Sequence, residues 1–177
     1  HVIDGKVYYI DYGMMTGSVY YNKDMWEAAG LTEADIPKTW DEMREVAKKL
    51  TIKEGDKLIQ AGLNFNDDFH QNYLLGLNYQ LGENLFLEDG RTPNVTCDAM
   101  KQVMQMLVDM YKVDGVGSEN FGEKGSDSFG QGQSAMVIQW GHYYNTLNTT
   151  WTDINFGVFE IPTFDGNPYA YNRYNGE

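Results

Sequence analysis

The chain has 177 residues, of which 42% are hydrophobic and 22% are charged, and its formal net charge is -13 at pH 7. A chain of this length can bury one hydrophobic core, so we expect one domain spanning 1–177. The negative charge would repel phosphate backbones, which excludes nucleic acid as an expected partner. The sequence has no apolar run long enough to span a membrane, and its lone Cys97 has no internal disulfide partner.

The first part of the chain alternates between extended and helical segments. Residues 7–10 are expected to form a short strand, followed by a glycine turn at Gly13 and Gly17 and a second extended run at 18–21. The short helix that follows can end in a left-handed cap at Gly30.

A second helix, at 39–50, has the clearest local signals. Thr39 and Glu42 have the spacing of a capping box, in which each side chain satisfies an unpaired amide at the helix start. Apolar residues then recur at helical spacing, which predicts that one face packs against a core. This face consists of Trp40, Met43, Val46, Ala47 and Leu50.

The middle of the chain is expected to contain a strand at 58–65, a helix at 69–81 and a hairpin at 84–91. A longer helix at 98–113 carries an apolar stripe, which indicates core packing rather than a methionine recognition surface. The stripe consists of Met100, Val103, Met104, Leu107, Met110 and Tyr111.

The last part of the chain continues the alternation. It is expected to contain helical turns at 126–132, a buried strand at 135–140, a helix at 142–147 and a last strand at 155–160. Strands that alternate with helices predict an α/β layer. We expect the strand at 135–140 to be central, with the two longest helices covering its faces.

Two junctions between a strand and a helix are candidate binding regions, because ligands in open α/β sheets gather where strands end. One is 66–70 and the other is 139–144, and they share one edge of the sheet if the two strands are parallel. An aromatic ring offers a flat apolar surface to a sugar, while carboxylates and amides bond its hydroxyls. This combination predicts a carbohydrate cleft. Its candidate ligand-binding residues are Trp140, Tyr143, Tyr144, Phe69, His70, Asp68, Asp67 and Tyr12.

These candidates also have structural interpretations. Trp140 ends an apolar strand and can instead cap the core. Tyr143 and Tyr144 cannot both face inward on one helix, so one of them is expected to be structural. Asp67 and Asp68 are also suitable helix caps.

Motifs that carry catalysis or hold a cofactor are not found. His70 and His142 lack a third ligand at useful spacing, so no metal site is expected. Asp67 and Asp68 are adjacent, whereas glycosidase carboxylates flank a bond from opposite faces. The sequence contains no P-loop, dinucleotide-binding glycine motif, HExxH or GxSxG. We therefore expect a non-enzymatic binding module without a cofactor.

Five stretches of the sequence together resemble one protein family. In chain order they are DGKVYYIDYG, YYNKDMWEAAGL, PKTWDEMREVAKKLT, FGQGQSAMVIQW and INFGVFEIPTFDG. They resemble family 1 of the extracellular solute-binding proteins, the maltose-binding-protein-like sugar-binding components of ABC importers. The resemblance covers nearly all of 1–177 and corresponds to most of the C-terminal lobe.

The resemblance implies one lobe of a two-lobe, type II periplasmic-binding-protein-like fold, an α/β structure with a mixed sheet flanked by helices. Hinge-proximal segments are then expected near 8–20 and 161–170. It implies an oligosaccharide held between this lobe and an N-terminal lobe, with ABC transporter permease subunits as partners. It also implies a protein in the periplasm, or lipid-anchored at the extracellular face of a bacterial membrane. Two alternatives remain open: a binding protein for a non-sugar solute such as a peptide, polyamine or metal chelate, and a carbohydrate-active enzyme.

Overall fold

The computed structural model describes residues 2–8, 10–65, 76–167 and 172–176, with only the backbone described at 11–15 and 172–176. The strands are β1 (Val2–Ile3), β2 (Lys6–Val7), β3 (Asp11–Asn22), β4 (Ile52–Glu54), β5 (Lys57–Gln60), β6 (Met136–Trp140), β7 (Phe156–Phe159) and β8 (Asn172–Gly176). The helices are α1 (Lys23–Ala28), the 3-10 turn η1 (Glu33–Asp35), α2 (Trp40–Leu50), α4 (Asp98–Lys112), α5 (Gly125–Gly130) and α6 (Tyr143–Thr149). A further helical segment lies at 76–80.

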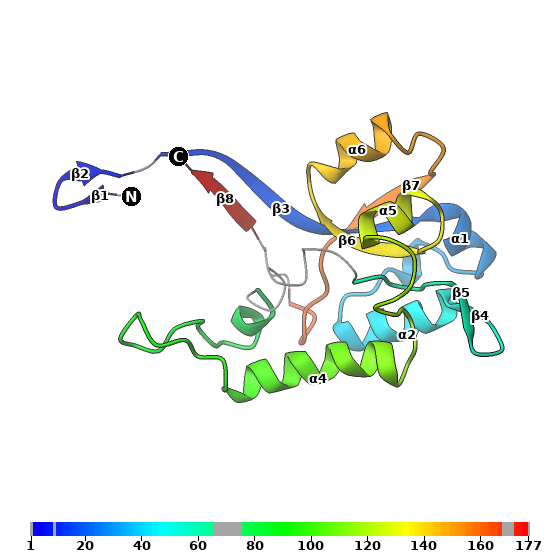
Figure 1. Cartoon of the computed structure of the whole chain (residues 1–177), viewed down its shortest axis with the longest axis horizontal. Coiled ribbons are helices and arrows are strands. Elements are labelled where there is room, and N and C mark those ends of the chain that lie inside the picture. The colour runs from blue at the N-terminus through cyan, green and yellow to red at the C-terminus, as the bar shows by residue number, and fades with distance from the viewer. Residues whose placement is uncertain (1, 9, 66–75, 168–171, 177) are drawn as a thin grey trace.

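The central strand of the main sheet is β3 (Figure 1). β3 pairs antiparallel with β6 on one side and with β7 on the other. The expectation that the strand at 135–140 is central is therefore wrong. Its predicted burial is confirmed, because every residue of β6 is buried.

The glycine turn expected at Gly13 and Gly17 is also wrong, because β3 passes through both residues as one strand. Its first half pairs with β8, and its second half pairs with β6 and β7, with Gly17 opposite Trp140. Ladder hydrogen bonds hold these glycines extended, and the register shift between Asp11 and Gly13 is the kind of irregularity that a strand glycine often marks. Since β8 follows β7, the strand expected at 155–160 is present but is not the last.

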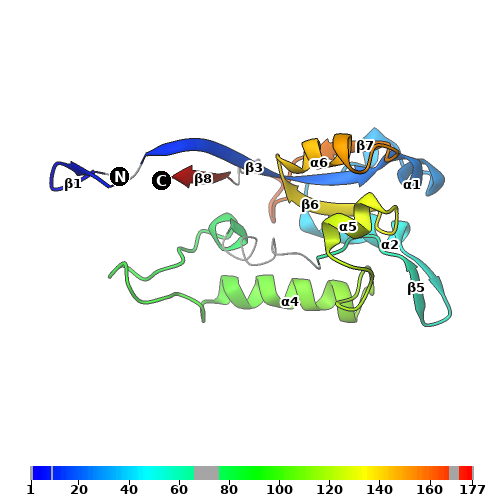
Figure 2. The same ribbon diagram turned by 45° about the horizontal axis from the view of Figure 1, so that its top comes forward.

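Helices pack on both faces of this sheet (Figure 2). α2 and α4 lie on one side, where Met136, Ile138 and Trp140 of β6 join the main core. Residues of α5 and α6 pack with Val137 and Tyr20 in a smaller core on the other side. Because side chains alternate along β6, the strand contributes apolar residues to both cores. The two longest helices share one face instead of covering both.

The helices begin and end largely as their sequences predict. The Thr39 hydroxyl accepts a hydrogen bond from Glu42 N at 3.2 Å, and the Glu42 carboxylate accepts one from Thr39 N at 3.1 Å, which confirms the capping box. All five residues of the expected α2 face are buried. Gly30 has a φ of 74° and ends α1 as expected.

The apolar stripe of α4 is only partly as expected. Met104 is 44% exposed, whereas Met106 is buried in its place. The buried residues of α4 are Ala99, Val103, Met106 and Met110.

The strand expected at 58–65 is shorter than predicted. β5 ends at Gln60 and pairs with β4 in a separate hairpin. The residues after it run beside the start of β6, with a parallel bridge between Ala61 and Ser134, so the two segments have the parallel orientation on which a shared edge depends. The hairpin expected at 84–91 is a loop with a single antiparallel bridge between Phe86 and Pro93.

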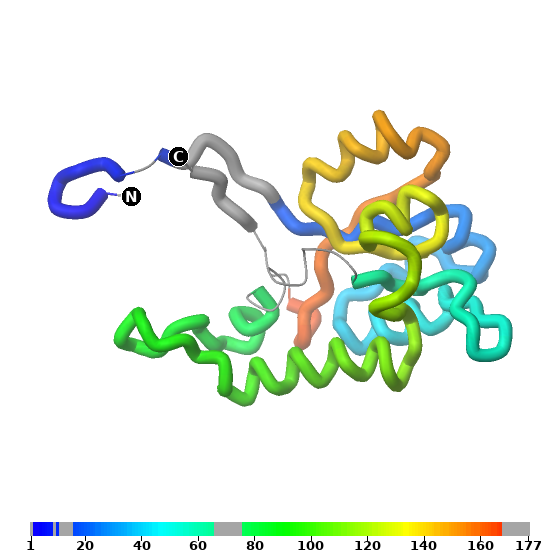
Figure 3. Tube along the Cα trace, viewed as in Figure 1, coloured from blue at the N-terminus to red at the C-terminus, as the bar shows by residue number. Residues whose placement is uncertain are grey.

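The first half of β3 pairs with β8 in a two-stranded ribbon that extends away from the helices (Figure 1). The β1–β2 hairpin lies at the far end of the molecule from the helices (Figure 3). Both strands of that hairpin are exposed along their length. Within the described residues, no helix is long and apolar enough to cross a membrane.

Candidate ligand-binding site

The turn after β6 is the part of the predicted site that the structure describes. Gly141 N donates a hydrogen bond to Thr16 O at 3.0 Å, which fixes this turn where β3 leaves the main sheet for the ribbon. Gly141 and His142 are exposed, and a Cβ at Gly141 would meet only Thr16 O, at 3.8 Å. The backbone of this turn is therefore open to an approaching ligand.

Trp140 lies mainly in the protein interior. Its side chain is 6% exposed and belongs to the main core together with Met136 and Ile138. A ring buried to this extent contributes chiefly to packing and leaves little surface for a ligand.

Tyr143 and Tyr144 point in different directions, as their helical spacing predicts. Tyr143 is buried, its hydroxyl donates to Ser126 O, and its ring packs edge-on against Tyr20 at a centroid distance of 5.2 Å. Tyr144 is 54% exposed and contacts Phe156 edge to face at 5.7 Å. Tyr143 is thus the structural member of the pair, and Tyr144 presents aromatic surface to solvent.

Hydrogen bonds from buried groups hold this end of β6. The Tyr20 hydroxyl donates to Trp140 O at 3.3 Å, which ties the last residue of β6 to the smaller core. Burial raises the pKa of Tyr20, so this hydroxyl stays protonated and remains a donor at neutral pH.

The remaining predicted residues have no described side chain. Asp67, Asp68, Phe69 and His70 lie outside the described residues. Tyr12 lies in the ribbon half of β3, where only the backbone is described. In the described part of the chain, no group of three or more His, Cys, Asp and Glu side chains could hold a metal ion.

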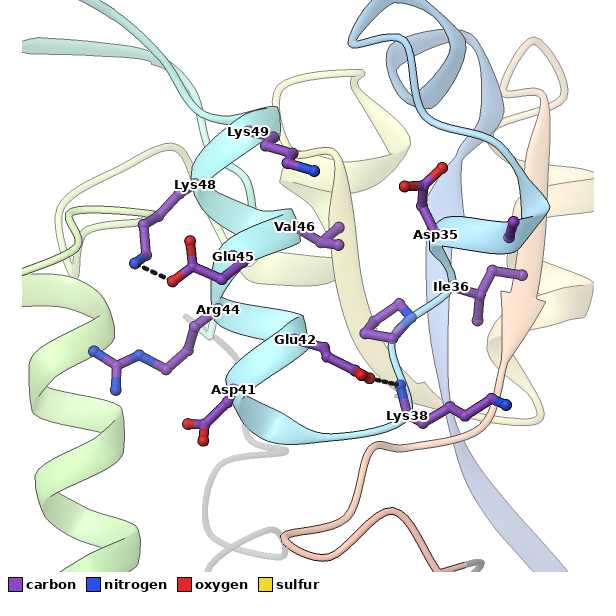
Figure 4. A pocket seen from close by; sticks show the side chains of 12 residues that line it. Asp35, Ile36, Lys38, Asp41, Glu42, Arg44, Glu45, Val46, Lys48 and Lys49 are labelled. Atoms are coloured by element: carbon purple, nitrogen blue, oxygen red, sulfur yellow. Dashed lines mark hydrogen bonds and ion pairs between the residues drawn. The ribbon is translucent and has the colours of Figure 1, made fainter.

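A hollow of about 710 Å³ lies between α2 and the turn before it (Figure 4). Part of its charge is paired within the chain: the Glu42 carboxylate accepts from the amides of Lys38 and Thr39, and Glu45 pairs with Lys48 at 2.5 Å. Carboxylates held in this way are less available to a ligand. We therefore interpret the hollow as a solvated charged surface and keep the turn after β6 as the candidate site.

Sequence reasoning missed a buried polar cluster that involves the segment beside β6. Asn64 is 2% exposed, and its amide contacts the Tyr111 hydroxyl and Ser128 Oγ. A polar residue within the apolar run Leu63–Phe65 is the one feature that could have indicated it.

A family model and several curated relatives match most of this chain. The model described as bacterial extracellular solute-binding protein matches residues 1–176. A putative binding protein of Brucella abortus is 28% identical over 167 residues, which are 91% of this chain and 39% of that protein. The chain therefore spans well under half the length of this relative.

Solved structures resemble the whole chain in fold. An ABC substrate-binding protein from Listeria monocytogenes in complex with cycloalternan has a TM-score of 0.81 at 20% identity, and the match covers 99% of this chain and 44% of that one. UgpB from Mycobacterium tuberculosis in complex with glycerophosphocholine has a TM-score of 0.78 at 19% identity, with coverage of 99% and 44%. At these identities the likeness shows the fold, and it confirms the predicted α/β lobe with a sheet flanked by helices.

Proposed function

Because this chain belongs to the bacterial extracellular solute-binding proteins, we propose that it is most of the C-terminal lobe of a carbohydrate-binding protein that serves an ABC importer. The oligosaccharide is held in a cleft between this lobe and an N-terminal lobe, and the permease subunits of the importer are the docking partner. The protein acts in the periplasm or as a lipoprotein at the extracellular face of the membrane. It binds its solute without transforming it.

The exposed apolar side chains beyond the ribbon support a second lobe. Val7 and Ile10 are 64% and 70% exposed, and Val2, Ile3 and Tyr8 are exposed as well. An isolated hairpin is at best marginally stable in water, so we expect these side chains to pack against further structure. In this proposal the ribbon of β3 and β8 belongs to the hinge region; its β3 half falls within the segment expected near 8–20, and β8 follows the segment expected near 161–170.

The main support for a sugar ligand is the half-exposed ring of Tyr144, in the first turn of α6, which follows the fully buried strand β6. A rigid aromatic surface beside an open backbone turn suits the C–H face of a sugar ring. In this proposal Tyr144 stacks on the sugar, while Trp140 and Tyr143 hold its helix and strand in place. The other proposed contacts are Asp67, Asp68, Phe69, His70 and Tyr12.

A phosphate ester is the second candidate solute, because the similar UgpB structure contains glycerophosphocholine. Such a ligand requires cationic groups in the cleft, since a phosphate is held by charge-assisted hydrogen bonds. The turn from Trp140 to Asn145 contains no lysine or arginine. The cations would therefore have to come from other segments, and we favour the sugar.

Titration calorimetry on the full-length protein tests the proposal. Maltotriose, cycloalternan and glycerophosphocholine are titrated in turn, and each mixture is then analysed by chromatography for products. Saturable binding of a saccharide without turnover is expected. Binding of glycerophosphocholine alone would favour the second candidate, and appearance of shorter sugars would show an enzyme.

The isolated lobe provides a second test. We expect residues 1–177 alone to bind the same sugar much more weakly, because a two-lobe protein divides its ligand contacts. Equal affinity of the isolated lobe would contradict a cleft shared between two lobes.

A further inference from the structure

The short segment 61–65 has a hydrogen-bond partner for every backbone amide. The first four amides bind main-chain oxygens, for example Asn64 N to Met136 O of β6 at 3.3 Å. The fifth, Phe65 N, donates instead to the side-chain hydroxyl of Tyr111. The partners of the five amides in order are Gln133 O, Val116 O, Val116 O, Met136 O and the Tyr111 hydroxyl. The Tyr111 hydroxyl thus accepts the hydrogen bond of the one amide in this segment that does not bind a main-chain oxygen.

Tyr111 is fixed from both sides of its hydroxyl group. The oxygen accepts from Phe65 N, and the hydroxyl proton is donated to Asn64 Oδ1 at 3.2 Å. The Tyr111 ring also packs against Phe65 at a centroid distance of 5.2 Å. Burial raises the pKa of Tyr111, so the hydroxyl keeps the proton that this arrangement needs.

Asn64 connects this bond to the other side of the lobe. Its Nδ2 donates to Phe121 O and to Ser128 Oγ, each at 3.3 Å. Ser128 is fully buried in α5. One buried amide therefore joins the segment that runs beside β6 to the end of α4 and to α5, and a fully satisfied polar cluster of this kind favours one backbone arrangement over its alternatives.

Gly117 makes room for the cluster. A Cβ at Gly117 would lie 2.5 Å from Leu63 O and 2.6 Å from the Tyr111 ring, so any larger residue would displace one of them. The loop after α4 is thus shaped to bring the Tyr111 hydroxyl to the end of the segment.

The geometry points to Tyr111, through Asn64, as a positioning residue for ligand binding: its hydroxyl fixes the backbone of Phe65, at the end of a described segment that runs parallel to β6. Asn64 N bonds Met136 O at the start of β6, and β6 continues in the same direction to Trp140 and the candidate site. This inference rests on the proposed function, because it concerns the affinity of that same site. A purely structural role would affect stability alone, so the test has to separate the two.

The full-length protein is compared with Tyr111→Phe, Ser128→Ala and the control Val103→Ala. Tyr111→Phe keeps the ring and removes only the hydroxyl, and Ser128→Ala is a milder change at the far end of the cluster. Val103 is a fully buried apolar residue two turns earlier on α4, so its truncation destabilises the same helix without touching the cluster. Melting temperature, maltotriose affinity by calorimetry, and hydrogen exchange of the peptides that span 61–65 and 140–144 are measured on each.

Tyr111→Phe is expected to weaken maltotriose binding about tenfold, because two buried partners lose their hydrogen bond. It should also speed hydrogen exchange at 61–65, and Ser128→Ala should do both to a smaller extent. Val103→Ala, at a comparable loss of melting temperature, should bind within about twofold of the unchanged protein. Tyr111→Phe that melts earlier but binds as tightly as Val103→Ala would overturn the inference.

Failure of the proposed function has a different signature. If the unchanged protein does not bind maltotriose, the sugar proposal is weakened for that ligand, and hydrogen exchange decides the positioning role. Faster exchange in Tyr111→Phe, but not in Val103→Ala, at both 61–65 and the candidate site at 140–144 then supports it. Unchanged exchange at either segment overturns it.

Discussion

In the full-length protein, truncation of Trp140 should mainly lower stability, whereas truncation of Tyr144 should mainly lower ligand affinity. Trp140 is 6% exposed and packed in the main core, so Trp140→Ala leaves a large cavity and should cost about 3–5 kcal/mol of unfolding free energy. Tyr144 is about half exposed and has one edge-to-face contact with Phe156. Its truncation should cost no more than about 0.5–1.5 kcal/mol.

The expected loss of ligand affinity depends on which of the two rings is exposed enough to stack on a sugar. If Tyr144 stacks on the sugar, Tyr144→Ala should lower affinity by about 2 kcal/mol, roughly thirtyfold. Trp140→Ala, measured at a temperature where it is folded, should bind within a few-fold of the unchanged protein. The sequence placed both Trp140 and Tyr144 among the candidate ligand-binding residues, and the burial of Trp140 is the reason for preferring Tyr144.

Urea unfolding and calorimetry with the best-binding sugar provide the two measurements. Tyr144→Phe is the matched control, because it keeps the ring face and removes only the hydroxyl. It should retain most of the affinity. A Trp140→Ala protein that remains stable but loses sugar binding, together with a Tyr144→Ala protein that binds normally, would refute the assignment.

Two further predictions concern the stability of the lobe. Arg44 Nε and Asp114 Oδ2 are 2.7 Å apart, and the Arg44 guanidinium lowers the pKa of Asp114, whose side chain is 7% exposed. Because the folded-state pKa is below the unfolded value of about 4, the pair stabilises the lobe at neutral pH, and this contribution is lost as the pH falls through the folded-state pKa. Asp114→Asn should therefore unfold at lower urea than the unchanged protein at pH 7, and the difference should shrink towards pH 3. Thr39→Ala removes one half of the capping box and should cost about 1 kcal/mol in the same assay, whereas no change would show that the cap does not contribute.

Local chemistry made α2 and α1 predictable. A capping box depends on two residues three positions apart, and a left-handed helix end depends on one glycine, so both signals lie within a few residues of the structure they specify. Thr39 with Glu42, and Gly30, behave accordingly. The alternation of such helices with apolar runs was also sufficient to predict the α/β class.

β3 was not predictable in the same way, because its structure depends on partners far along the chain. Its glycines favour turns in isolation, and the bonds that keep them extended come from β6, β7 and β8, more than 100 residues away in sequence. The buried face of α4 was predicted only in part for a different reason. Met100, Met104, Met106 and Met110 allow two apolar stripes at helical spacing, and only the surrounding core selects the one that includes Met106.

The candidate site has the same dependence on distant partners. The order strand, tryptophan, glycine, helix located the turn after β6 correctly, since it follows from residues adjacent in sequence. Whether an aromatic ring in that turn is free depends on what covers it, and Trp140 is covered by residues of a core drawn from the whole chain. Tyr143 and Tyr144 could be separated only into one inward and one outward ring, because helical geometry fixes their relative direction and not their surroundings.

Tyr111 and Asn64 are 47 residues apart, and neither residue is unusual within its own segment of the sequence. Their hydrogen bonds form only when the fold brings the end of α4 next to the segment beside β6. A positioning group of this kind can therefore be recognised from a structure but not from the sequence alone.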